Sequence, residues 1–199
     1  MPLRGQWIGV IALTGACLVS LEAAVISRQS GESFSKKVTQ VRLHAEGDGS
    51  QARRTTFTQD ELNSWLMYQG QPLLPNGVTQ PQVTIVGDGQ LAGQATVDLE
   101  AIGKKRSTGG TFDPWSLLGG KVPLTVRGIL HTRDGMGKLE IQSAEVSGVP
   151  VPLSVLQELV GFYSRTPDHP EGLRLDQTFS LPARIKQIEV GQSQAVVVQ

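Results

Sequence analysis

The feature that most limits the fold of this chain is the alternation of apolar and polar side chains over residues 80–102 and 121–146, on either side of a long loop. An alternation of period two is typical of a β-strand with one buried and one solvent-facing side. Gly87-Asp88-Gly89 and Asp134-Gly135 interrupt the alternation in the way that hairpin turns do. Because consecutive hairpins place neighbouring strands side by side, this region predicts an antiparallel sheet with one wet face.

The last strand of the predicted sheet contains a change of phase. Leu139 and Ile141 share one phase of the alternation, whereas Ala144 and Val146 have the opposite phase. One extra residue in a strand produces such a change. The sequence therefore predicts a β-bulge near Ser143.

A helix precedes the sheet and begins after Thr58. Thr58 and Glu61 have the spacing of a capping box, in which each side chain hydrogen-bonds the backbone N–H of the other residue. Leu62, Trp65 and Leu66 follow at spacings of three and four, which is the period of an amphipathic helix. The Gly and Pro that come next predict the end of this helix.

Residues 152–163 predict a second helix that is apolar on almost every side. Such a helix needs apolar packing partners on nearly all of its sides, and a strongly curled sheet would supply them. Two short strands are predicted around Gly191. The expected fold class is α+β: a curled antiparallel sheet of four to six strands wrapped on this long apolar helix, plus an N-terminal helix after a signal or anchor segment.

The N-terminus has the composition of a targeting segment. Arg4 precedes an apolar run over residues 7–26, and a basic start before a short apolar stretch is typical of a secretory signal. About 20 apolar residues also suffice to span a bilayer as a helix. Residues 1–28 are therefore predicted to be either a signal peptide or an anchor in the cytoplasmic membrane. Both alternatives export the remaining chain, to the periplasm or to the periplasmic face of that membrane.

The single cysteine, Cys17, excludes a disulfide within the chain. Lipidation of Cys17 is not favoured, because Thr14 stands where a lipobox has a Leu-like residue and the apolar run continues past the cysteine. Residues 29–55 are polar and basic in patches, which predicts a polar tether with at most one short element. Residues 56–199 are predicted to form the α+β domain.

Charge and motifs narrow the classes of function. The chain has 18 basic and 18 acidic side chains and no net charge, whereas nucleic-acid binding normally needs a basic excess that neutralises phosphates. A dinucleotide-like glycine pattern at residues 87–92 leads into a strand, although such a site needs a helix N-terminus. His44, His131 and His169 lack metal-ligand spacing. The sequence predicts a protein that is not an enzyme and has no metal or cofactor.

The segment 103–120 combines a basic triplet with an amphipathic turn that contains a tryptophan. Trp is favoured at membrane interfaces, and basic side chains are attracted to anionic lipid. The segment is predicted to be a membrane-docking tip or a gate over an apolar cavity; alternatively, its apolar side chains fold inward onto the core. The residues concerned are Lys104, Lys105, Arg106, Trp115, Leu117 and Leu118.

Several segments together share a pattern with a known group of proteins. They are residues 57–66, with the Leu62-Asn63 pair in the helix, the turn 75–78, the strand 95–102, the loop 115–119, the apolar helix 152–163 and the closing hairpin around 185–190. This order resembles the YceB-type bacterial envelope lipoproteins and, more loosely, the mycobacterial LmeA-type proteins. Both groups are related in fold to tubular lipid-binding (TULIP, BPI-like) and SMP-like domains. The resemblance covers about residues 56–198 and implies lipid binding in an apolar groove, without catalytic residues; the missing lipobox departs from the pattern.

The leading functional hypothesis is a non-catalytic envelope protein that binds or transfers a lipid or another apolar ligand. The alternative is an envelope scaffold with a closed core and no ligand, and an enzyme would need polar residues that converge in a pocket. The same side chains would border a groove or fill a core. They are Leu62, Trp65, Leu66, Val97, Leu99, Leu124, Val126, Leu156, Leu159, Val160 and Tyr163.

Overall fold

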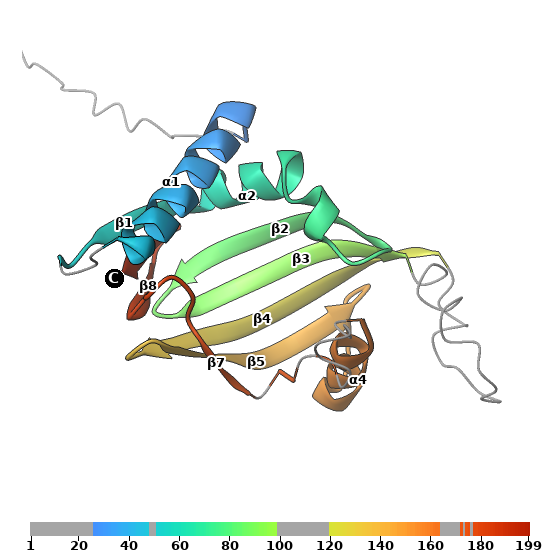
Figure 1. Cartoon of the computed structure of the whole chain (residues 1–199). Helices are drawn as coiled ribbons and strands as arrows, with labels where there is room; N and C mark the ends of the chain where they lie inside the picture. The colour runs from blue at the N-terminus through green and yellow to red at the C-terminus, as the bar shows by residue number, and fades with distance from the viewer. Residues whose placement is uncertain (1–25, 48–50, 99–119, 164–171, 173, 176) are drawn as a thin grey trace, which may run out of the picture.

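Two antiparallel sheets and three α-helices form the described part of the chain, which is α+β as the sequence predicts (Figure 1). The structure is a computed structural model. It describes residues 26–47, 51–98, 120–163, 172, 174–175 and 177–199. The predicted targeting run at 7–26, except Ile26, and most of the segment 103–120 lie outside these residues.

The elements follow one another in this order along the chain. The helices are α1 (Arg28–Glu46), α2 (Gln59–Tyr68) and α4 (Leu153–Tyr163), with a 3-10 turn η1 (Gln71–Leu73). The strands are β1 (Arg54–Thr58), β2 (Val78–Gly87), β3 (Gln90–Asp98), β4 (Lys121–Arg133), β5 (Met136–Val146), β6 (Val149–Pro150), β7 (Thr178–Ser180), β8 (Gln187–Gly191) and β9 (Gln194–Val198).

The larger sheet has the order β2-β3-β4-β5-β6, and β7 pairs with β5. Its first two hairpins, β2–β3 and β4–β5, are those predicted from the alternating pattern. The register between β4 and β5 changes from Arg127 opposite Ser143 to Gly128 opposite Ile141. This change confirms the predicted bulge near Ser143.

The larger sheet has one apolar and one polar face. The register and the alternation place buried and half-buried apolar side chains together on one face, among them Ile85, Leu91, Ala95, Val97, Val122, Leu124, Val126, Leu130 and Ala144. The other face carries exposed polar side chains such as Thr84, Gln94 and Arg127. The expectation that one face of the sheet is apolar and the other is exposed to solvent is therefore confirmed.

The smaller sheet has the order β1-β9-β8 and pairs the first strand of the chain's described part with its last, because Arg54 of β1 lies opposite Val198 of β9. Helix α1 packs beside α2 and the small sheet (Figure 1). The prediction of a polar tether over residues 29–55 is wrong here, since residues 29–46 belong to α1, which begins at Arg28, and residues 54–55 begin β1. The physical reason is a narrow apolar stripe on α1, in which Val41 is buried.

The prediction of one curled sheet around a long apolar helix is also wrong for the described residues. The apolar helix α4 has only 11 residues and lies beside one end of β5, away from α1 and α2 (Figure 1). Its Leu156 is buried, whereas Leu153 is exposed on 44% of its surface. A short helix at the rim of the sheet needs cover on one side only, so no curled sheet is required.

Polar side chains of α2 protect the outer edge of β2. Asn63 is buried, and its amide donates to Val83 O (2.8 Å) and accepts from Val83 N–H (2.7 Å). Gln59, one turn earlier, accepts from Ile85 N–H (2.8 Å). These bonds take the place of a neighbouring strand and satisfy backbone groups that an open edge would leave unpaired.

Replacing Asn63 by Ala should destabilise the fold strongly. The substitution leaves both the N–H and the C=O of Val83 without a partner where α2 covers the edge of β2, and each such group costs about 1–3 kcal/mol. We expect the free energy of unfolding in urea to fall by roughly 2–4 kcal/mol. The matched control is Asn76→Ala in the exposed turn before β2, which should change it little. Equal effects of the two substitutions would contradict the assigned role.

Within the part of the chain that the structure describes, no helix combines the length and apolarity needed to cross a membrane.

Candidate functional site

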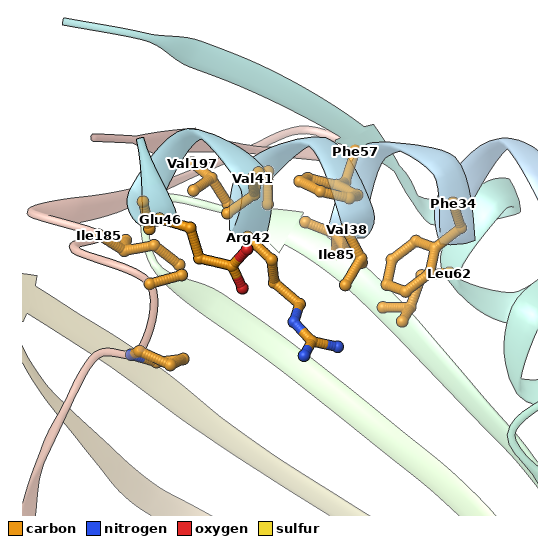
Figure 2. A pocket seen from close by; sticks show the side chains of 14 residues that line it. Phe34, Val38, Val41, Arg42, Glu46, Phe57, Leu62, Ile85, Ile185 and Val197 are labelled. Atoms are coloured by element: carbon orange, nitrogen blue, oxygen red, sulfur yellow. The ribbon is translucent and has the colours of Figure 1, made fainter. Parts of the chain in front are cut away.

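An apolar cavity of about 620 Å³ lies beneath α1, between this helix, the small sheet and the edge of the large sheet (Figure 2). Its walls come from α1, β1, α2, β2, β9 and the segment that leads into β8. The lining residues are Phe34, Val38, Val41, Arg42, Ala45, Glu46, Phe57, Leu62, Ile85, Pro182, Ala183, Ile185, Ala195 and Val197. All but two of these side chains are apolar.

One face of α1 forms the roof of the cavity. Phe34, Val38, Val41 and Ala45 follow one another at spacings of four, three and four, which places them on one side of a helix. Phe34 packs against the ring of Phe57 on β1, with 5.2 Å between the ring centroids. The roof is thus joined to the small sheet at the end of the cavity nearest α2.

The small sheet and β2 form the opposite walls. Phe57 and Ala195 are register partners on β1 and β9 and face the same side of the small sheet as Val197. Ile85 is buried at 4% exposure and lies on the apolar face of the large sheet. Because β-strand side chains alternate, Phe57, Ala195 and Val197 share the face of the small sheet that lines the cavity.

Two charged side chains mark the side on which the cavity meets solvent. Arg42 and Glu46 are exposed and lie one helical turn apart in the last part of α1. Figure 2 shows both leaving α1 on the same side as Val38, with the guanidinium and the carboxylate apart from each other. The site therefore has an apolar interior and a mouth with one positive and one negative group.

Hydrogen bonds from Gln199 connect two walls of the cavity. The residue is 4% exposed, and its side-chain amide donates to Val41 O of α1 (2.9 Å) and to Ala183 O (2.7 Å). Its Oε1 is buried and has no hydrogen-bond partner within the described residues. The amide thus holds the C-terminal half of α1 at a fixed position over the segment before β8.

Glu61 fixes the other half of α1. Its carboxylate closes the predicted capping box by accepting from Thr58 N–H (3.0 Å). It also accepts from Ser33 Oγ (2.6 Å) and Lys37 Nζ (2.7 Å), both on α1. Burial raises the pKa of this carboxyl, but the bonds from Lys37, Ser33 and the Thr58 backbone and the charge of Lys37 outweigh it. The pKa of Glu61 therefore lies below its ordinary value of 4.5.

A second hollow of about 640 Å³ lies between β4, β5 and β8. Its lining includes charged side chains of both signs, namely Asp88, Arg133, Lys138 and Glu189. A shallow region with exposed charges offers little apolar burial to a ligand. The cavity beneath α1 is the better candidate site.

The residues predicted for an apolar groove lie in several places. Leu62 lines the cavity, and Trp65 packs against Phe34 with 5.3 Å between ring centroids. Val97 and Leu124 belong to a separate core cluster on the large sheet. The other described members are half-buried or buried on α2, β4 and α4, namely Leu66, Val126, Leu156 and Val160.

The remaining predicted positions lie outside what the structure describes. They are Leu99, Lys104, Lys105, Arg106, Trp115, Leu117 and Leu118, together with the side chains of Leu159 and Tyr163. Their proposed roles as groove, gate or docking residues stay predictions.

Sequence reasoning missed the roof of the cavity. The spacing of Phe34, Val38, Val41 and Ala45 is the signal that could have revealed a helix, but it is surrounded by polar and charged residues. Arg42 and Glu46 gave no signal at all, because an exposed pair of opposite charges on a helix is common.

No protein-family model, no curated protein and no solved structure matches this chain. The resemblance to envelope lipid-binding proteins stays a prediction, and the geometry of the cavity carries the functional argument.

The stabilisation by Glu61 should depend on pH. Because the folded pKa lies below 4.5, the contribution is fully present above the unfolded pKa and is lost as the pH falls through the folded pKa. Urea unfolding at neutral pH and at about pH 3 should show a smaller loss of stability for Glu61→Gln than for the unsubstituted chain. Glu32→Gln on the exposed side of α1 is the control and should keep the full loss. A Glu61→Gln chain with an unchanged pH dependence would refute the role of this carboxylate.

Proposed function

We propose that this protein binds a lipid or another ligand with an apolar tail in the cavity beneath α1, and that it does so without catalysis. The observation that carries the proposal is an apolar cavity of about 620 Å³ with charged groups at its mouth alone. Small-molecule sites have volumes of about 300–1,000 Å³, mostly apolar walls and a few placed polar groups. The cavity has each of these properties.

The driving force for such binding would be the removal of apolar surface from water. A tail in the cavity would contact Phe34, Val38 and Ile85 on three different elements. Burial is favourable by about 25 cal/mol per Å² of apolar surface. Among the described lining residues, all but Arg42 and Glu46 are apolar, which favours binding over catalysis.

We further propose that the domain works at the outer side of the cytoplasmic membrane, as the apolar run at 7–26 indicates. The chain passes from this run into α1 without a long linker. Ser27 N–H donates to Ser64 Oγ (3.2 Å), and the Arg28 guanidinium lies 5.0 Å from the centroid of the Tyr68 ring. If the run is retained as an anchor, these contacts would keep the domain close to the bilayer, where lipid ligands are available.

Photocrosslinking of the full chain in living cells tests the proposal. Cells fed a fatty acid that carries a diazirine and an alkyne would be irradiated, and the purified chain would be digested and mapped by mass spectrometry. Labels should fall on peptides from α1, β9 and residues 182–185. Label found on other peptides alone, or no label, would contradict the proposal and favour a scaffold with a closed core.

Filling the cavity should abolish labelling. Ala45 lines the cavity, so Ala45→Trp places an indole where the tail would lie, and the label on α1 should fall at least about tenfold because a filled site loses its apolar burial. Leu43→Trp is the matched control on the same helix, at a position that is 60% exposed, and should label normally. Thermal unfolding would verify that both variants fold, and equal labelling of the two would refute the site.

A further inference from the structure

The charged side chains at the mouth of the cavity have positions that suit a ligand of defined charge. Arg42 and Glu46 are the charged members of the lining. They lie four residues apart on one helix face, and such residues have their Cβ atoms about 5–6 Å from each other. The two groups are exposed and project on the cavity side of α1 (Figure 2).

Neither charge contributes to the contacts that hold the described fold. No hydrogen bond or salt bridge of either side chain occurs within the described residues, whereas the neighbouring Lys37, Arg53 and Arg54 all have side-chain partners. The order of the pair, with the cation before the anion along the helix, is also the less favourable one for a direct contact.

The carboxylate of Glu46 lies at the end of a helix that does not stabilise negative charge. Glu46 is the last residue of α1, and the C-terminal end of a helix dipole disfavours negative charge. The nearby Arg184 donates to Gly47 O (3.5 Å) and not to this carboxylate. A cationic group of a ligand would therefore find an acceptor that the described chain does not use.

We infer that the mouth of the cavity selects a zwitterionic amphiphile, whose anionic group binds Arg42 and whose amine binds Glu46 while its apolar tail enters the cavity. The inference rests on the proposed function. A guanidinium binds phosphate or carboxylate oxygens through two parallel hydrogen bonds. A phosphate and an amine separated by a two-carbon unit match two side chains one helical turn apart.

The test uses three photoactivatable probes with the same diazirine-bearing acyl chain. The headgroups are neutral (a monoacylglycerol), anionic (a free fatty acid) and zwitterionic (lysophosphatidylethanolamine). The full chain is reconstituted in phosphatidylglycerol vesicles that contain each probe at an equal, low mole fraction, and the label on α1 peptides is measured after irradiation. The neutral probe reports on the cavity alone and so monitors any damage to the fold.

Arg42→Gln and Glu46→Gln should each lower labelling by the zwitterionic probe by about fivefold. A loss of this size corresponds to the strongest interactions measured for exposed ion pairs. In both variants this loss should clearly exceed any change in labelling by the neutral probe. The double exchange Arg42→Glu with Glu46→Arg keeps both charges at the mouth and should restore labelling by the zwitterionic probe.

The other outcomes separate this inference from the proposed function. One outcome is that the neutral probe labels α1 but neither substitution changes labelling by the zwitterionic probe. That outcome would overturn the headgroup assignment and leave the cavity as a lipid site. If Glu46→Gln increased labelling by the fatty acid and by the zwitterionic probe alike, the mouth would select an anion alone. No labelling by any probe would overturn the proposed function itself.

Discussion

The carboxylate of Glu61 is the contact on which the cavity depends. It accepts hydrogen bonds from its own capping box at Thr58 and from Ser33 and Lys37, which lie one turn apart on α1. Lys37 also donates to Thr56 O of β1, so α1, α2 and β1 meet at one group whose side chain is 12% exposed. Charge-assisted hydrogen bonds have preferred lengths and directions, whereas apolar burial is non-directional. The carboxylate therefore fixes both the position and the rotation of α1, and the rotation decides which face of the helix becomes the roof.

The parts of the fold that could be predicted from the sequence are those whose partners are close along the chain. The capping box, both hairpins and the bulge near Ser143 each depend on residues within a short window. The parts that could not be predicted depend on distant partners. Strand β1 exists because Arg54 pairs with Val198 near the other end of the chain, and helix α1 is fixed by bonds from Ser33 and Lys37 to Glu61. A polar helix with one narrow apolar stripe looks like a linker until its partner is known.

The candidate site was harder to predict than the fold, for a related reason. A sequence pattern indicates which face of an element is apolar, but not which face lies opposite or how much space remains between them. Leu62 was predicted and lines the cavity, whereas Val97 and Leu124 have the same apolar character and fill a separate core cluster. Phe57 belongs to the core and to the cavity wall at once. The difference between filling a core and bordering a cavity therefore depends on the packing of whole elements.

An apolar cavity of this size needs walls that cannot approach one another, because interior atoms gain dispersion energy by close packing. The polar contacts at the two ends of α1 supply this restraint. Glu61 holds the N-terminal half through Ser33 and Lys37, and Gln199 holds the C-terminal half through Val41 O while it also bonds Ala183 O. Movement of α1 toward the sheet would distort these hydrogen bonds. Most of their groups are partly buried, so the distortion would cost free energy, and this cost opposes collapse of the cavity. A tail in the cavity would provide the contacts that these fixed walls cannot make with each other, so ligand binding and the stability of the fold should be linked.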